Sequence, residues 1–370
     1  MKIECCVKDC LILRQHTFLF ISKMKKVFLL LLVPCLSWAR PPELPFNNRP
    51  PGKVIRTCCA FGVDVKMNMI PFAKVTSISA PSHLGTHIYL GNKQENNGII
   101  YTHRGGFIDM GHLRDIADYT AYFYNLMITN RNQGLSNFKL GNEAGLKMIS
   151  FQIPEPFTNK DIALLAGKLA YDLSIWHEMA TWFGASYIPF IPERYSSFSI
   201  EDAYSNLLGV QIAIQAILSE KDYEHSMTEL IQNTLQELRA VETIEDTREA
   251  MNEVKDNWWS SLVKMPNRKV MLMREFDCLE NVQPWLIESW SSVEYSMELQ
   301  VSKYSSQNEL LTDFYQFSVK HSLRIPFKKI FPYSYKERII TQHDFPILLE
   351  YIKAEDKAYW EKARNSKFLQ

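Results

Sequence analysis

The sequence has no net charge and no excess of either sign. Its 370 residues include 41 Lys and Arg against 41 Asp and Glu, and the pI is about 7.1. A uniform balance of this kind gives no general attraction to nucleic acid or to an anionic membrane surface, so charge-based recognition must be local. With 46% hydrophobic residues, the chain is long and apolar enough to bury a globular core.

A long hydrophobic run is also lacking. The apolar stretch at 27–36 is shorter than the roughly 20 residues that a membrane-spanning helix needs. Two lysines precede it and Ser-Trp-Ala follows it, so residues 24–39 are typical of a secretory signal peptide that is cleaved after Ala39. Met24 would be a good start for such a signal peptide. Residues 1–23, which precede it, therefore indicate an over-extended gene start. We therefore expect an exported protein, periplasmic or secreted, without a transmembrane segment in the mature chain.

Cysteines are few once that segment is removed. Only Cys58, Cys59 and Cys278 remain in the mature chain. An odd number in an oxidising compartment allows at most one intramolecular bridge, from either member of the pair to Cys278. The alternative is that all three are small core residues or spare thiols.

The mature chain reads as a Pro-rich leader, 40–53, followed by a single α+β domain, 54–370, that is mainly helical with a small N-terminal antiparallel sheet. Strands are expected at 63–70 and in a hairpin of 86–91 with 98–103. A further strand is expected at 270–276. Capping residues and apolar stripes predict helices at 109–127, 161–183, from Ser199 (N-cap) to 218, 227–240, 244–257, 308–319 and 344–362.

Asp109, His112 and Asp115 recur at three-residue spacing, so on a helix they fall within an arc of about 120°. Two carboxylates and an imidazole on one face suit a divalent metal such as zinc, or a carboxylate that orients a catalytic histidine. Alternatively, Asp109 caps the helix, Asp115 pairs with a nearby arginine and His112 is an ordinary surface residue.

Gly105 and Gly106 stand between an expected strand end and this helix, next to Arg104. Exposed backbone N–H groups at such a junction can bind a phosphate or a developing oxyanion. The alternative is a plain, tight strand-to-helix turn.

The string WHEMATWFG, 176–184, places His177 on a helical face with small, mostly apolar neighbours. It resembles the first half of the zincin motif H-E-x-x-H, but Thr181 occupies the position of the second histidine, which rejects a zincin. His177 is either one ligand of a site completed by the 109–115 helix or a hydrogen-bonded core histidine. In the following PERYSSFSIED, helix capping accounts for Ser199 and Asp202, which leaves Glu193 and Glu201 as candidates.

The strings CCAFG, YTHRGGFIDMGHLRDIADYT, HEMATWFGAS and SSFSIEDAYSNLLG resemble those of a bacterial family of exported proteins, domain of unknown function 4056. The resemblance covers residues 56–209. It implies export and a common domain, and the family brings no established activity.

A second resemblance lies in SHLGTHIYLGN, which is similar to the histidine-bearing strand of NlpC/P60 papain-like hydrolases. It implies a cysteine nucleophile, Cys58 or Cys59, activated by His83 or His87.

Three hypotheses follow. In the first, a cell-envelope hydrolase gathers Asp109, His112, Asp115 and His177 around a metal, with Glu178 as general base, His112 as a catalytic group and Arg104 as an anion clamp. The second is a non-catalytic envelope protein that binds a ligand or partner in a cleft lined by tryptophans, and the third is the cysteine hydrolase. Imidazoles of His112 and His177 more than about 12 Å apart would exclude a shared ion.

Overall fold

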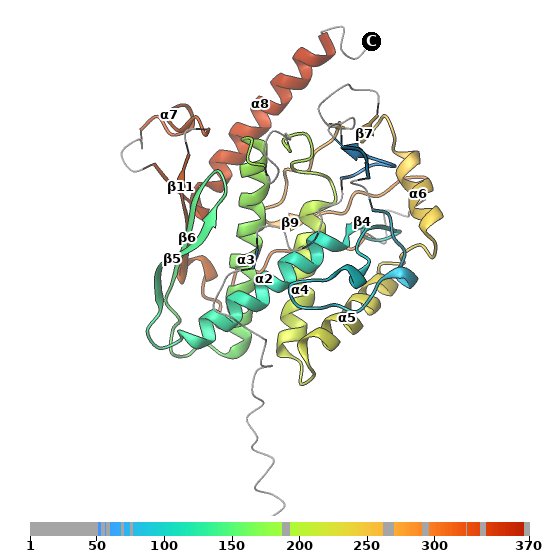
Figure 1. The fold of residues 1–370 in the computed structure, drawn as a ribbon. Coiled ribbons are helices and arrows are strands. Elements are labelled where there is room, and N and C mark those ends of the chain that lie inside the picture. The colour runs from blue at the N-terminus through green and yellow to red at the C-terminus, as the bar shows by residue number, and fades with distance from the viewer. Residues whose placement is uncertain are drawn as a thin grey trace, which may run out of the picture. The chain divides into compact units, whose positions relative to one another are not determined.

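Three long helices form the centre of the molecule: α2 (Met110–Thr129), α3 (Asn159–Trp182) and α4 (Asp202–Leu218). They pack against one another in all three pairs, and Figure 1 shows them together between the strands β5 and β6 and the helix α5. The backbones of α2 and α4 approach closely at Gly209. A Cβ at this position would lie 2.1 Å from the backbone oxygen of Leu113. Glycine at that position lets the two backbones approach.

The coordinates are a computed structural model that describes residues 51–52, 56, 60–67, 70–74, 77–186, 193–261, 270–290, 296–322, 324–333 and 338–365. The signal peptide expected at 24–39, and Cys58 and Cys59, lie outside them. Residues Leu44–Gln370 form one compact unit, and the other unit, Met1–Glu43, lies outside the described residues. No helix among the described residues is long and apolar enough to cross a membrane.

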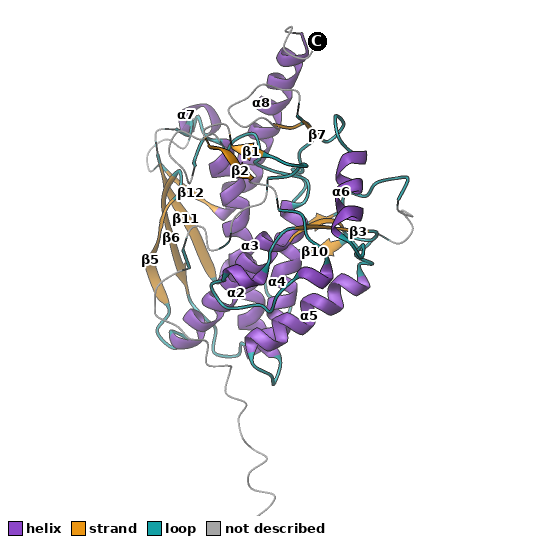
Figure 2. Ribbon diagram, turned by 45° about the vertical axis from the view of Figure 1, so that its right-hand side comes forward, coloured by secondary structure: helices purple, strands orange, loops and turns teal. Residues whose placement is uncertain are grey.

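The main sheet is antiparallel, in the order β12-β11-β6-β5. Figure 2 shows these four strands side by side at one edge of the unit. Their bounds are β5 Leu135–Asn142, β6 Gly145–Phe151, β11 Tyr315–His321 and β12 Ile339–Thr341. The helix expected at 308–319 is therefore wrong. Tyr315, Phe317 and Val319 alternate inward from β11, the two-residue period of a strand.

A β-hairpin leads directly into helix α2. It pairs β3 (Ile99–Thr102) with β4 (Gly106–Asp109). The sequence predicted a different partner, residues 86–91, and that expectation was wrong. The backbone N–H groups of residues 87–90 donate to side chains instead, among them Glu95 and Asp118, so this stretch needs no strand partner.

The remaining helices largely follow the sequence patterns. A capping box of Thr243 and Asp246 opens α6, as predicted. Ser199 does not cap α4: its hydroxyl donates to Glu201 at 2.5 Å, and the helix begins at Asp202. The other elements are β1 Lys66–Met67, β2 Ile70–Lys74, α5 Tyr223–Glu237, α6 Ile244–Glu253, β7 Trp259–Ser260, β8 Val270–Met271, β9 Asn281–Val282, β10 Leu299–Gln300, α7 Phe327–Ile330 and α8 Phe345–Asn365.

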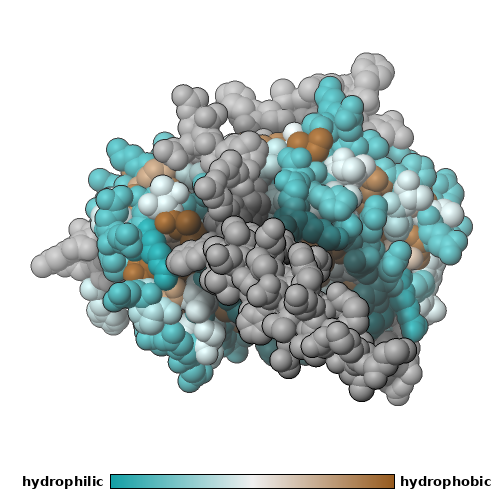
Figure 3. Space-filling view, turned by 90° about the horizontal axis from the view of Figure 1, so that it is seen from below, coloured by the Kyte–Doolittle hydropathy of each residue, from teal (hydrophilic) through white to brown (hydrophobic). Residues whose placement is uncertain are grey.

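The fold is α+β, with helices and small antiparallel sheets, as the sequence predicts. The surface seen from below is mostly hydrophilic where it is described, and its hydrophobic spots are small and separate (Figure 3). Isolated apolar residues on a surface are normal and do not by themselves mark an interaction site.

Candidate metal centre

Two helices bring three ligand-type side chains together. His112 lies in the first turn of α2, and His177 and Glu178 lie near the end of α3. One ligand atom from each of the three falls within 4.8 Å of the other two. The imidazoles therefore meet the distance condition for binding a shared ion, with a buried carboxylate beside them.

Two carboxylates lie at ion-pair distance from the imidazole of His112. Its Nδ1 lies 2.9 Å from Oδ1 of Asp202 at the start of α4 and 3.3 Å from Oδ2 of Asp109. Asp109 also caps α2, because its Oδ1 accepts the backbone N–H groups of Gly111 and His112. Because Nδ1 faces these carboxylates, Nε2 is the nitrogen of His112 suited to a metal.

His177 has the same arrangement. Its Nδ1 lies 2.6 Å from Oε1 of Glu143, in the turn between β5 and β6, and the other oxygen of Glu143 accepts from Lys147 at 2.6 Å. Burial works to lower the pKa of His177, but Glu143 outweighs it, and the net pKa lies above the usual value. Burial likewise opposes ionisation of Glu143, but Lys147 and His177 hold its pKa well below the usual range.

Glu178 is held by the backbone of the segment before α4. Its Oε2 accepts the N–H of Phe198 at 2.5 Å. Burial, and next the charge of Asp202, raise the pKa of Glu178 to about 7. Burial and Asp202 also raise the pKa of the neighbouring Glu201 well above its usual value. Carboxylates crowd together here away from water, an environment that a bound cation would stabilise.

Asp115 does not join this cluster. Its Oδ1 accepts from Arg56 at 2.8 Å. Burial raises the pKa of Asp115 to about 6, and the charge of Arg56 acts against that rise. Of the two carboxylates expected beside His112, only Asp109 contacts it.

Gly105 lies in the turn between β3 and β4 and Gly106 is the first residue of β4, so the pair does not stand at a helix start. The N–H of Gly105 donates to Oγ1 of Thr102 at 2.9 Å. Gly106 has φ +67°, and a Cβ there would lie 2.3 Å from the backbone oxygen of Trp285. The guanidinium of Arg104 donates to the backbone oxygen of Glu237, at the end of α5. The positive φ of Gly106 and its close approach to Trp285 thus give a structural reason for glycine at this position.

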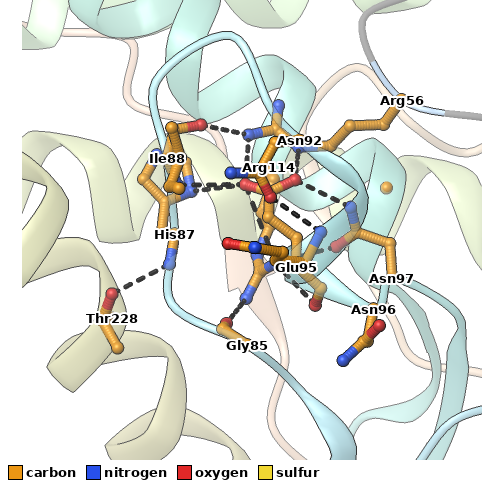
Figure 4. Close-up of polar contacts among 12 residues, drawn as sticks. Arg56, Gly85, His87, Ile88, Asn92, Glu95, Asn96, Asn97, Arg114 and Thr228 are labelled. Atoms are coloured by element: carbon orange, nitrogen blue, oxygen red, sulfur yellow. Dashed lines mark hydrogen bonds and ion pairs between the residues drawn. The ribbon is translucent and has the colours of Figure 1, made fainter.

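A second polar cluster surrounds Arg56 (Figure 4). The guanidinium contacts Glu95 at 2.6 Å, Asp115 at 2.8 Å and Asp118 at 3.0 Å, and it donates to the backbone oxygen of Ile88. Both Arg56 and Glu95 are almost fully buried. This network holds Arg56 and the segment that contains Ile88 and Glu95 against α2.

The histidines expected to activate a cysteine differ in environment. His83 is exposed, and its Nδ1 lies 3.3 Å from the hydroxyl of Ser82. His87 is buried, with Nε2 3.0 Å from Oδ1 of Asp118. Cys278 is a free, buried thiol, and burial raises its pKa far above the usual value.

The tryptophans expected to line a cleft pack mainly against other aromatic rings. Trp258 and Trp285 are 5.5 Å apart, centroid to centroid, and Trp290 contacts the rings of Tyr101 and His103. Trp259 is buried, and its indole N–H donates to the backbone oxygen of Met251. Trp259 thus belongs to a hydrophobic core cluster, and the partly buried Trp258, Trp285 and Trp290 pack against that cluster.

A pocket of about 330 Å³ opens beside the three-residue cluster. His177 and Thr181 of α3 form part of its wall, and Glu143, Glu193 and Arg324 add charged groups. A small molecule in this pocket would therefore lie against one of the two imidazoles.

Sequence reasoning missed the partners of both histidines. The local sequence around Asp202 indicates a helix-capping residue. Its contact with His112 joins two different helices and leaves no pattern in the local sequence. Glu143 lies in the turn before strand β6. Because the sequence patterns did not predict this sheet, they gave no reason to place Glu143 near His177. Only the packing of α2, α3 and α4 brings these residues together.

Comparison with known proteins gives one match. The family model described as "Protein of unknown function (DUF4056)" matches residues 46–288. No curated protein and no solved structure matches the chain. Because the family model covers more than half of the sequence, the chain belongs to the DUF4056 family.

Proposed function

We propose that the protein is a metal-dependent hydrolase in which His112, His177 and Glu178 bind one divalent ion, with zinc the best fit. The observation that carries the proposal is the convergence of these three ligand atoms within 4.8 Å. Two imidazoles and one carboxylate are a common ligand set of catalytic zinc, which keeps a further position for water or substrate.

The surroundings of the three side chains support a metal over a chance cluster. Each has a polar partner: Asp202 lies at ion-pair distance from His112, Glu143 is hydrogen-bonded to His177, and Glu178 accepts the N–H of Phe198. Carboxylate partners of this kind fix the ring orientation of metal-binding histidines and make them more basic ligands.

The chemistry follows from the ion. Zinc held by three protein ligands lowers the pKa of a bound water to about 7 and so supplies hydroxide near neutral pH. The pocket next to His177 would admit the substrate. Hydrolysis of an ester or amide in the cell envelope is the reaction that best combines this site with the signal peptide expected at 24–39.

Activity on envelope components tests this proposal. The zinc-loaded protein should hydrolyse a member of a panel of peptidoglycan fragments, peptides and phospholipids, and a chelator should abolish the activity until zinc is restored. His112→Ala should be inactive, whereas His225→Ala, which removes an exposed histidine paired with Glu229, should retain activity. Full activity of His112→Ala would reject the site. Zinc binding without any turnover would favour the non-catalytic ligand-binding function.

One observation favours the cysteine hydrolase as a second candidate. His87 is buried with Nε2 on Asp118, while its Nδ1 has no hydrogen-bond partner among the described residues, the nearest carboxylate oxygen of Glu95 being 3.8 Å away. A base oriented by a carboxylate, with its other nitrogen available, is what a nucleophilic thiol requires. Activity that survives chelation but is lost in Cys58→Ala or Cys59→Ala would establish this candidate in place of the metal enzyme.

A further inference from the structure

The pocket beside the proposed metal centre is lined mostly by residues with polar or charged side chains. Among its described lining residues the aliphatic side chains are only those of Ala144 and Ala185, and the others are mostly polar or charged, including Asn142, Ser186 and Ser322. A pocket that binds an acyl chain is lined mainly by large apolar side chains. Of the envelope substrates considered, the lining therefore disfavours a lipid tail in this position.

One cation in the pocket, Arg324, has no acidic partner among the residues that the structure describes. The guanidinium of Arg324 is exposed, and within the described part of the chain its one side-chain hydrogen bond goes to the backbone oxygen of Gly184, with no carboxylate at ion-pair distance. By contrast, Glu143 in the same wall is paired with Lys147 at 2.6 Å and contacts His177. Glu193 also lines the pocket and is not among the contacts of Arg324.

We propose that Arg324 binds a carboxylate of the substrate, so that the enzyme acts on a peptide-like amide with a free carboxylate close to the bond it cleaves. This inference rests on the proposed metal-dependent function. A single guanidinium matches a planar carboxylate in a bidentate contact, and neighbouring hydroxyl and amide groups can add hydrogen bonds. The volume of about 330 Å³ is at the small end for ligand pockets and fits one or two amino-acid residues.

A pair of hydroxamates tests the proposal on the full chain loaded with zinc. Succinic monohydroxamate carries a metal-binding hydroxamate and a free carboxylate, and its amide analogue has the same size without the charge. The acid should bind about 10- to 100-fold more tightly than the amide, the range expected for a charge-assisted hydrogen bond. Removing zinc should abolish binding of both.

Arg324→Gln should remove the preference for the acid while leaving binding of the amide and of zinc unchanged. Lys328→Gln is the matched control, because it removes an exposed positive charge on α7 outside the pocket lining and should keep the preference. Equal affinity of acid and amide for the unaltered protein would overturn the carboxylate proposal and leave the metal site standing. Failure of both compounds to bind would overturn the open metal site as well.

Discussion

At the scale of single residues, the proposed metal centre would depend on carboxylates that are not themselves proposed ligands. Glu143 is hydrogen-bonded to Nδ1 of His177, and Asp202 lies 2.9 Å from Nδ1 of His112. Such partners fix which ring nitrogen faces the metal and how the ring is turned. In the proposed site the four residues would act as two pairs, each made of a histidine ligand and the carboxylate next to its Nδ1.

Glu143→Gln is expected to weaken zinc binding about 10- to 100-fold, the usual effect of losing a carboxylate behind a metal-binding histidine. The physical reason is that a neutral amide stabilises the imidazole less and can hold it in the wrong tautomer. Competition with a chromogenic chelator measures the zinc Kd. Glu155→Gln, at an exposed site, is the control. An unchanged Kd in the Glu143 variant would show that His177 is not a ligand.

Zinc affinity should rise with pH up to and somewhat above neutrality. His177 has a raised pKa and Glu178 a pKa of about 7, so below pH 6 zinc must displace a proton from both. Each displaced proton changes the Kd up to about tenfold per pH unit below the pKa of its group, and the effect fades above that pKa. Calorimetry in buffers of different ionisation enthalpy should detect proton release at pH 6. An absence of proton release would contradict metal binding by His177 and Glu178.

Glu178→Gln separates two roles of Glu178. As a ligand, Glu178 should be needed for tight zinc binding, so the variant should lose both metal affinity and activity. As a general base, it would be needed for turnover only. Parallel measurement of zinc content and hydrolysis distinguishes the two, and zinc retained at full stoichiometry in an inactive variant would contradict the ligand role.

At the scale of elements, the hairpin turn before α2 explains the Gly-Gly pair. Gly106→Ala should destabilise the protein by about 1–3 kcal/mol or more, because the residue has a positive φ and the new Cβ would meet the backbone oxygen of Trp285. Gly141→Ala is the control, since it shares the positive φ but has open space around it. Equal losses in chemical denaturation would show that the approach of Trp285 does not matter.

The Arg56 network should contribute more to stability than exposed ion pairs do. Arg56→Met leaves the buried carboxylates of Glu95 and Asp118 without their cation, which typically costs about 3–5 kcal/mol. The comparison is Arg248→Met, which breaks an exposed pair with Asp64 at 3.5 Å and should cost less than about 1 kcal/mol. Urea unfolding of both variants measures the difference, and similar losses would contradict a structural role for the network.

Elements with strong local signals could be predicted from the sequence, and those that depend on distant partners could not. The apolar stripe after Asp109 and the capping box of Thr243 and Asp246 indicated helices that the structure contains. Strand β11 was mistaken for a helix, because only its pairing with β6 and β12 makes it a strand. His112, His177 and Glu178 were all picked out from their local patterns. The carboxylates next to the two histidines, Glu143 and Asp202, could be identified only from the tertiary packing.

At the scale of the whole molecule, an ion at this site would tie α2 to α3 in the centre of the fold. Metal that binds only the folded state stabilises it by RT ln(1 + [Zn²⁺]/Kd), or about 2.7 kcal/mol at a free concentration of 100 Kd. The thermal midpoint should therefore rise with zinc and fall with chelator. His112→Ala should abolish this response, and a zinc effect that persists in that variant would place the ion elsewhere.

X-ray absorption at the zinc edge of the loaded, full-length protein examines the coordination itself. The expected spectrum shows one zinc per chain with two imidazole nitrogens at about 2.0–2.1 Å and oxygen ligands at about 2.0–2.2 Å, and it loses one imidazole contribution in His177→Ala. A sulfur ligand at about 2.3 Å, or a shell without imidazole, would contradict binding by His112, His177 and Glu178.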